Sequence, residues 1–264
     1  MLARQRQAVI LEETRRSGAV RVSELVHRLG VSDMTIRRDL DVLAGRGLVE
    51  KVYGGATNVA PAGGDLDRDP CARQRRLHTA IAVEAARLVR PGTAVGLSSG
   101  AASRSLARVL EPVPDLTVVT NSLAVADIAA ASARPDRVVV LTGGVRGESD
   151  VLVGPLAVQS LRGLHLDLVF LGVHGIAERS GCTVPSLSES EADRALVEAG
   201  RTLVVLADHT CWGVAGIATV AALSDADVLI SDDGLDASAR DILAARVGEL
   251  VIAKSPDTDT TPTA

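Results

Sequence analysis

Arginine and small polar residues recur near the N-terminus of the chain in a pattern that suits contact with DNA. The stretch V-S-D-M-T-I-R-R-D-L occupies residues 31–40. Apolar residues at helical spacing form its inward face, namely Ile36, Leu40 and Leu43. The residues left on the outward face are Met34, Arg37 and Arg38, with Ser32 and Thr35 at the edge. Arginine at the start of an exposed helix can pair with a guanine edge or with a phosphate. This spacing predicts a recognition helix.

A second group of candidate binding residues follows the apolar runs of the remaining chain. These residues are Ser98, Ser99 and Gly100, then Asn121, then Gly143, Gly144 and Arg146, then Asp208. Ligands of parallel sheets bind where the strands end. Backbone N–H groups at helix N-termini, with serine and asparagine beside them, suit a phosphate or a carboxylate. The pattern therefore predicts a pocket for a small anion. The guanidinium of Arg146 can pair with that anion through two N–H groups.

The elements that position the first group form a helix-turn-helix from about Val20 to Asp39. We expect a helix over residues 3–16, a short extended link, and a helix over 24–29 capped by Ser23. Gly30 ends that helix in a tight turn, and Ser32 caps a third helix that runs to about residue 44. Alternating residues between flanking glycines then predict a β-hairpin wing, in which Lys51 and Tyr53 lie beside the DNA backbone.

The second group requires a larger α/β domain. Apolar runs predict strands at 94–98, 116–120, 137–142, 166–172, 202–207, 227–231 and 249–253. Helical stretches lie between them, near 77–90, 102–110, 123–132, 155–163, 189–200 and 236–246. This alternation indicates a parallel sheet with helices on both faces. The Val-rich runs 116–120 and 137–142 are typical of strands that are covered on both sides.

The predicted organisation is a DNA-binding domain over residues 1–57, a linker over 58–71, a sensing and oligomerisation domain over 72–254, and a disordered tail over 255–264. Charge supports this division. Residues 1–57 contain ten Lys or Arg against seven Asp or Glu, a net charge of +3, while the whole chain carries −5. A basic N-terminal segment joined to an acidic remainder fits a DNA-binding module joined to a domain that does not bind DNA.

Several protein classes are disfavoured by the sequence. Three widely spaced cysteines indicate neither a disulfide framework nor a metal site. The first residues become charged too early for a signal peptide, and no apolar run approaches the length of a membrane helix. We therefore expect a soluble cytoplasmic protein without a cofactor, a bound metal or a membrane partner.

The motifs around residues 6–56 resemble the DeoR family of bacterial repressors. The resemblance extends through Thr120-Asn121-Ser122, Gly143-Gly144, Gly154, Glu189 with Arg194, and Asp208. It implies a sensor domain similar in fold to ribose-5-phosphate isomerase, which binds phosphorylated sugars or related intermediates, with Glu189, Arg194 and Asp208 in its effector site. The chain departs from the family in two places. Ser98-Ser99-Gly100-Ala101-Ala102 replaces Asp-Ser-Gly-Thr-Thr, and Asp193 and Cys211 stand where lysines are usual.

These observations predict a repressor of a sugar or carbohydrate catabolic operon. Its expected partners are a double-stranded DNA operator, a small anionic metabolite of the phosphorylated-sugar type, and further copies of the chain in a dimer or tetramer. Two alternatives stay open. One is a sugar-phosphate isomerase-like enzyme with Asp208 or Glu189 as the base, which would need a cation other than lysine, because no lysine lies between residues 52 and 253. The other is a DNA-binding dimer that needs no effector.

Overall fold

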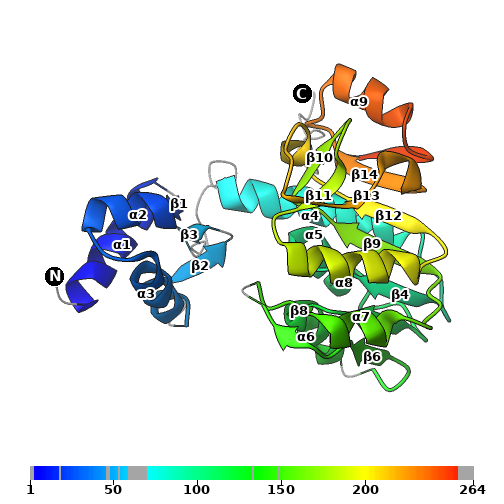
Figure 1. Ribbon diagram of the computed structural model, residues 1–264, viewed down its shortest axis with the longest axis horizontal. Coiled ribbons are helices and arrows are strands. Elements are labelled where there is room, and N and C mark those ends of the chain that lie inside the picture. Colours follow the sequence, from blue (N-terminus) through cyan, green and yellow to red (C-terminus); the bar gives the residue numbers. More distant parts are fainter. Residues whose placement is uncertain are drawn as a thin grey trace, which may run out of the picture. The chain divides into compact units, whose positions relative to one another are not determined.

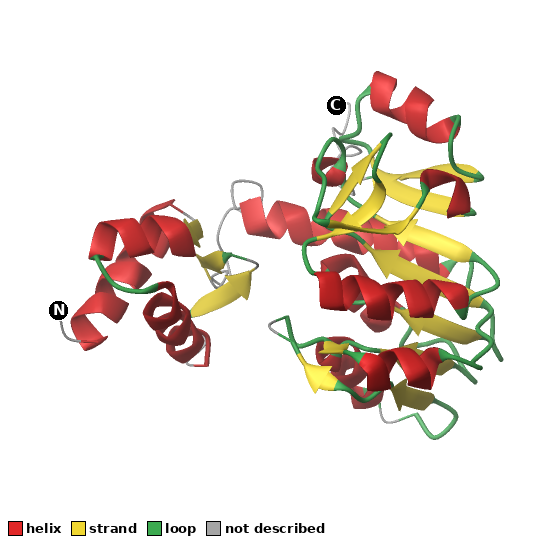
Figure 2. Cartoon of the chain, in the orientation of Figure 1, coloured by secondary structure: helices red, strands yellow, loops and turns green. Residues whose placement is uncertain are grey.

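The chain folds into two compact units, Met1–Arg75 and Arg76–Ala264. The computed structural model describes residues 3–17, 19–45, 48–52, 54–58, 70–132, 134–147 and 149–254 (Figure 1). The predicted tail lies outside the described residues. A small winged helix-turn-helix precedes a larger α/β unit, so the predicted fold class is confirmed (Figure 2). Among the described residues, every helix is too short or too polar to cross a lipid bilayer.

The first unit packs helices against a small antiparallel sheet. Its helices are α1 (Ala3–Ser17), α2 (Val22–Leu29) and α3 (Asp33–Gly45), and its strands are β1 (Ala19–Arg21), β2 (Val49–Val52) and β3 (Gly55–Asn58). The strands pair in the order β1-β3-β2. Ile36, Leu40 and Leu43 are buried in one core with Ile10 and Leu25, as the spacing predicts.

The turn between α2 and α3 follows the sequence, except at its first cap. Gly30 adopts a left-handed conformation with a φ of 63°, which glycine reaches without the steric penalty of a Cβ atom. The predicted capping by Ser23 is wrong, because α2 starts two residues earlier, at Val22, and its N-cap residue is Arg21. Val22 is apolar and buried, and its backbone N–H bonds to the carbonyl of Gly54. This hydrogen bond between Val22 and the wing fixes the position at which α2 begins.

The second unit is built on a parallel sheet of seven strands. They are β4 (Ala94–Leu97), β5 (Thr117–Thr120), β6 (Val138–Leu141), β9 (Leu168–Gly172), β12 (Leu203–Leu206), β14 (Val228–Asp232) and β15 (Glu249–Ala253). Their order across the sheet is β15-β14-β12-β9-β4-β5-β6. Each of the strands predicted from the apolar runs is present.

Helices cover the two faces of this sheet through two separate cores. On one face lie α4 (Pro70–Ala86), α5 (Ala101–Val109) and α6 (Leu123–Ala131). On the other lie α7 (Pro155–Leu161), α8 (Leu187–Glu198) and α9 (Ala237–Ala244), and α7 and α8 are in front in Figure 1. Helix α4 begins earlier than predicted, so residues 70 and 71 of the expected linker are helical, and Asn58 belongs to β3. The remaining linker residues lie outside the described part of the chain.

Several short strands were not predicted. An antiparallel sheet contains β10 (Gly175–Ala177), β11 (Gly181–Val184) and β13 (Ala218–Ala221), and β7 (Val145–Arg146) pairs with β8 (Leu152–Val153). Two short 3₁₀ helices, η1 (His209–Cys211) and η2 (Leu223–Asp225), also occur. Elements of two to four residues are too short to show a periodic pattern.

The interpretation of residues 137–142 as a doubly covered strand is wrong. Among the described residues, strand β6 pairs only with β5 and ends the sheet. Val138 is 54% exposed and Leu141 is 40% exposed, whereas Val118 and Val119 of β5 are buried. Both strands have the same Val-rich composition, so their different burial comes from their places in the sheet.

Candidate DNA-binding surface and effector site

The outward face of α3 presents the residues predicted to contact DNA. Met34 is 80% exposed, and Arg37 and Arg38 are exposed beside it. Ser32 precedes the helix, and its Oγ accepts a hydrogen bond from the backbone N–H of Thr35. The structure thus gathers these five predicted residues at the N-terminal half of one helix.

The two arginines of this face are available to a ligand. Nε of Arg37 lies 2.5 Å from Oδ1 of Asp33, one helical turn earlier, and both side chains are about half exposed. Exposed ion pairs of this kind contribute little to stability, so the guanidinium can exchange Asp33 for a phosphate or a base at small cost. Arg38 is also exposed to solvent.

Asp39, which follows the arginines in the motif, has a structural place instead. It is only 4% exposed, and its Oδ2 lies 2.5 Å from Nε of Arg6 in α1. Its Oδ1 accepts a second hydrogen bond from Nε2 of Gln7 at 2.9 Å. This buried network fastens α1 to α3 and thereby holds the recognition helix in position.

The wing residues complete the predicted DNA-binding set only in part. Lys51 lies in β2, where its backbone pairs with Ala56 of β3. Nothing is described of its side chain, and Tyr53 lies outside the described residues. Their contact with DNA stays a prediction.

The order of the parallel sheet reverses between β4 and β9, and ligands of such sheets bind at the carboxyl ends of the strands at this switch point. Ser98 follows β4 and is fully buried, and its Oγ accepts a hydrogen bond from the N–H of Gly172 at 2.8 Å. A Cβ atom on Gly172 would lie 2.6 Å from the carbonyl oxygen of Ser99. The two loops are therefore in direct contact, and Ser98 is a residue that holds them together.

Helix α5 begins at this switch point, after Gly100. The φ of Gly100 is 122°, a conformation that favours glycine, and no described side chain caps the helix. Ala101 and Ala102 offer no hydroxyl. The first N–H groups of α5 therefore suit an anion that binds through backbone contacts alone.

The third part of the site lies where β5 ends and α8 covers the sheet. Asn121 is fully buried, and Asp193 of α8 is 2% exposed. Burial and the neighbouring Glu189 raise the pKa of Asp193 to about 7, and the Asn121 amide opposes that shift. Neither polar atom of the Asn121 side chain, nor Oδ1 of Asp193, has a well-formed hydrogen bond among the described residues.

Gly143, Gly144 and Arg146 follow β6 and are exposed. A Cβ atom on Gly144, whose φ is 122°, would lie 2.6 Å from the carbonyl oxygen of Val153, so the turn into β7 requires glycine. Arg146 makes an exposed ion pair with Asp150 at 2.6 Å. Its guanidinium is accessible to an anionic ligand.

Two histidine–aspartate pairs at the ends of β12 and β14 were missed from the sequence. Nε2 of His78 in α4 lies 2.8 Å from Oδ2 of Asp208, and Nδ1 of His209 lies 2.8 Å from Oδ1 of Asp232. Burial alone would raise the pKa of Asp208, but hydrogen bonds from His78 and Thr210 hold it below its usual range. No sequence signal joins His78 to a residue so far along the chain.

Asp208, His209 and Asp232 each offer a donor atom within 4.8 Å of the others, which is the spacing that a metal ion needs. The atoms that could bind a metal ion already make hydrogen bonds within the protein. Oδ1 of Asp208 accepts from the N–H of Thr210, and Oδ2 of Asp232 accepts from the N–H of His209. A hydrogen-bonded network accounts for their geometry.

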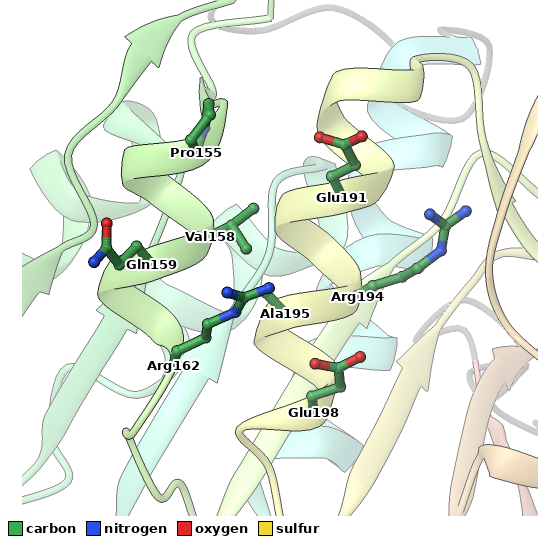
Figure 3. A pocket seen from close by; sticks show the side chains of 8 residues that line it. All are labelled: Pro155, Val158, Gln159, Arg162, Glu191, Arg194, Ala195 and Glu198. Atoms are coloured by element: carbon green, nitrogen blue, oxygen red, sulfur yellow. The ribbon is translucent and has the colours of Figure 1, made fainter.

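Arg194 does not join the predicted effector residues. Its guanidinium donates to the carbonyl oxygen of Thr219 from the exposed side of α8. It also lines a hollow of about 550 Å³ between α7 and α8, where Figure 3 shows it pointing away from Glu191. The side chains of this hollow are Pro155, Val158, Gln159, Arg162, Glu191, Arg194, Ala195 and Glu198. Mixed charges on an open surface are typical of a solvated groove.

Family models match both units of the chain. The DeoR-like helix-turn-helix domain matches residues 6–61, and the DeoR C terminal sensor domain matches residues 73–233. The chain belongs to the DeoR family. It is a transcriptional regulator with a DNA-binding helix-turn-helix, and the resemblance seen in the sequence is confirmed.

DeoR-type relatives match along most of their length. The uncharacterized regulator YgbI of Escherichia coli is 33% identical, with 97% of this chain and all of that protein covered. The putative aga operon transcriptional repressor of E. coli O157:H7 is 28% identical, over 94% and 93% of the two chains. The glycerol-3-phosphate regulon repressor of E. coli is 28% identical, over 86% and 90%.

The solved structures that match share less with this DeoR-family chain. Ribose 5-phosphate isomerase A from Methanocaldococcus jannaschii is 17% identical, with a TM-score of 0.37 over 51% of this chain and 53% of its own. A likeness of this size says nothing about catalysis or ligands.

Cys211 stands where the resemblance to the DeoR family implies a lysine. Burial raises the pKa of the Cys211 thiol to about 12, so the thiol is neutral at pH 7. The family's lysine would carry a positive charge at this position. Neither the neutral Cys211 thiol nor Asp193 supplies a positive charge at this edge of the sheet.

Proposed function

We propose that this DeoR-family regulator represses a sugar or carbohydrate catabolic operon, and that a small anionic metabolite releases it from its operator. One observation carries the proposal: a helix with exposed arginines and a sheet edge with buried, unpaired polar groups occur in a single chain. The names of relatives support the metabolic class, since one is a glycerol-3-phosphate regulon repressor and another an aga operon repressor.

The proposed DNA contacts are base edges and phosphates for Met34, Arg37 and Arg38, with Ser32, Thr35, Lys51 and Tyr53 at the margin. The experiment is selection of genomic fragments by the purified full chain, followed by titration of the selected fragment against a scrambled one. We expect specific binding that weakens with rising salt, because phosphate contacts release counterions. Equal affinity for both fragments would contradict the proposal.

The proposed effector site lies along the edge formed by Ser99, Gly100, Asn121, Glu189 and Asp208, with Ser98, Gly143 and Gly144 shaping the loops and Arg146 at the rim. It excludes Arg194. A neutral thiol at Cys211 and a carboxyl group at Asp193 disfavour a dianion, because like charges repel even when screened. We therefore infer a ligand with one negative charge and several hydroxyl groups, a refinement of the phosphorylated sugar expected from the family.

A matched series of ligands tests this inference. Aldonates, alditols and aldose phosphates of equal carbon number carry one, no and two negative charges. Release of the full chain from its selected DNA fragment is measured for each. We expect release at lower concentrations by an aldonate than by the aldose phosphate. The opposite order would contradict the single-charge effector and leave the regulatory function intact.

Catalysis as a sugar-phosphate isomerase is less well supported. A general base works best with a pKa near 7, and hydrogen bonds hold that of Asp208 well below this value. Asp193 has a suitable pKa, but the groups that shift it are Glu189 and Asn121, and neither is a cation that could stabilise an enediolate. Absence of turnover of D-ribose 5-phosphate is the expected result.

An effector-independent dimer is also less well supported. Buried polar atoms without partners cost free energy, and a domain that served only to join two DNA-binding units would gain nothing from them. We propose that the second unit both senses the ligand and assembles the dimer or tetramer. Sedimentation of the full chain measures the assembly, and a monomer at micromolar concentration would contradict that part.

A further inference from the structure

Two polar side chains at the end of β5 are buried without hydrogen bonds. Asn121 is 0% exposed and Asp193 is 2% exposed. Oδ1 and Nδ2 of Asn121 and Oδ1 of Asp193 make no well-formed hydrogen bond among the described residues, although the two side chains are close enough for the Asn121 amide to lower the pKa of Asp193. More than nine in ten buried polar groups are paired in folded proteins, so three unpaired atoms in one place need an explanation.

The surrounding backbone fixes both residues in this position. The carbonyl oxygen of Asn121 accepts from the N–H of Leu152 in β8, and the next residue, Ser122, caps α6 through Oγ. Asp193 lies on the buried side of α8, between Ala192 and Ala195. Helix α8, which carries Asp193, packs on β8 and on β9 of the sheet.

The chemistry of the three atoms selects among ligand groups. Oδ1 of Asp193 and Oδ1 of Asn121 accept hydrogen bonds, and Nδ2 of Asn121 donates them. A phosphate or carboxylate only accepts and would face Asp193 and Glu189 with a like charge. An ammonium group only donates and would leave Nδ2 unpaired. A hydroxyl group does both, and two adjacent hydroxyl groups can pair all three atoms.

We propose that Asn121 and Asp193 form a subsite for adjacent hydroxyl groups of a sugar or polyol chain. One hydroxyl donates to Oδ1 of Asp193, and the adjacent hydroxyl donates to Oδ1 of Asn121 and accepts from Nδ2. This subsite rests on the proposed sensing function, and it assigns the hydroxyl-bearing part of the ligand to the end of β5. The anionic part then binds at the uncapped start of α5, beside Gly100.

Asp193 and the neighbouring Glu189 give this subsite its selectivity, because an anionic group bound there would meet a like charge. A lysine at position 193 would meet an anion at the place where Asp193 accepts from a hydroxyl. The charge of the ligand must therefore lie away from α8. The distance between its anionic group and its recognised hydroxyls is set by the spacing of the adjacent strands β4 and β5, about 5 Å.

The test is isothermal titration calorimetry on the full chain with glycerol, erythritol, ribitol and D-glucitol, and with the aldonates of the same carbon numbers. Asp193→Ala and Asn121→Ala are compared with Glu191→Gln, which removes an exposed carboxylate from the same helix. We expect at least one polyhydroxylated probe to bind the natural chain. Its affinity falls about tenfold to a hundredfold in the two alanine variants and stays unchanged in Glu191→Gln.

Asp193→Asn provides a second measurement that needs no bound ligand. Asparagine has nearly the volume of aspartate and carries no charge, so the variant should melt at a higher temperature than the natural chain at pH 8. A lower melting temperature would show that Asp193 supports the fold and would overturn the subsite.

The remaining outcomes separate this inference from the proposed function. If no probe binds the natural chain, or if binding survives both alanine variants, the hydroxyl subsite is overturned. If an aldose phosphate binds and Asp193→Ala strengthens it, Asp193 only repels the ligand and the subsite is again overturned, while sensing stands. Loss of sequence-specific DNA binding by the natural chain would instead overturn the proposed regulator.

Discussion

Each of the two units contains a buried aspartate, and the contrast between them separates architecture from recognition. Asp39 is 4% exposed, and both of its oxygens are bonded, to Arg6 and to Gln7. Asp193 is 2% exposed, with one oxygen unpaired and Asn121 unpaired beside it. Burial is nearly equal, so the partners make the difference. A paired buried carboxylate holds elements together, and an unpaired one calls for a ligand.

The comparison extends to the surfaces that the two units offer. The first unit presents outward side chains from one continuous helix, α3. The second presents buried side chains from loops that follow separate strands and from a covering helix. Recognition of DNA can therefore be located from local periodicity, whereas recognition of a small molecule depends on which loops the sheet order brings together.

The largest expected effect comes from breaking the paired aspartate. Asp39→Ala leaves the Arg6 guanidinium buried without its main partner, and we expect a loss of about 3–5 kcal/mol in the free energy of unfolding of the first unit. Chemical denaturation followed by circular dichroism measures it. A loss below about 1 kcal/mol would mean that the Arg6–Asp39 pair behaves as an exposed ion pair.

The unpaired aspartate should behave in the opposite way and depend on pH. Folding raises the pKa of Asp193 from 3.8 to about 7, so between these values the folded state binds more protons than the unfolded state. Its contribution to stability therefore falls as the pH rises from about 4 to about 7, by about 1.4 kcal/mol per unit at most, and is level above. Asp193→Asn should lack this dependence.

The measurement is the difference in unfolding free energy between Asp193→Asn and the natural chain across that pH range, with Glu191→Gln as the control. The advantage of the asparagine variant should grow with pH and reach about 1–3 kcal/mol at pH 8. A constant difference would show that Asp193 keeps an ordinary pKa and has a partner.

Substitution on α3 tests the exposed side of the comparison. Arg38→Ala should weaken binding of the selected DNA fragment by about 1–3 kcal/mol if the residue contacts a base edge, and the fold should be unaffected because the side chain is exposed. Binding of specific and scrambled DNA at several salt concentrations distinguishes base contact from phosphate contact. Arg90→Ala, an exposed arginine of the second unit, is the matched control. Unchanged affinity in both Arg37→Ala and Arg38→Ala would disprove the recognition-helix assignment.

The smallest expected effect comes from restoring the family's residues at the effector edge. Ala101→Thr with Asp193→Lys supplies a hydroxyl at the start of α5 and a cation in place of the carboxyl group. Affinity for aldose phosphates should rise about tenfold, or about 1.4 kcal/mol. Ala102 is left unchanged because it is buried against the core, where added volume costs stability. Calorimetry that shows tight phosphate binding by the natural chain and no gain in the variant would contradict the proposed role of these departures.

Much of the architecture was predictable because it follows from the local periodicity of apolar residues. The parallel strands, the helices between them and the helix-turn-helix each follow runs of apolar residues at a spacing of two or of about three and a half. The buried positions Ile36, Leu40 and Leu43 follow from the same rule. Short strands such as β7 and β8 were not predicted, because two residues are too few to show a periodic pattern. The N-cap of α2 differs from the predicted one because the N–H of Val22 bonds to the carbonyl of Gly54.

The candidate site was predictable only as a set of loops. The sequence placed Ser99, Asn121 and Asp208 at strand ends, and the sheet order put their loops at one edge. Sequence reasoning missed the pairing of His78 with Asp208 and of His209 with Asp232. It included Arg194, which lies on the exposed side of α8. Adjacent residues on a helix face different directions, so the burial of Asp193 and the exposure of Arg194 depend on which side of α8 meets the sheet.

The sequence by itself determined the family, the order of elements and the outward face of α3, because these depend on neighbours along the chain. The tertiary structure alone decided that β6 is an exposed edge strand while β5 is buried, that Asp39 is paired, and that Asp193 and Asn121 lie together unpaired. These features join residues far apart in sequence. Contacts of that kind follow from how the strands are ordered and the helices packed, and no local spacing records them.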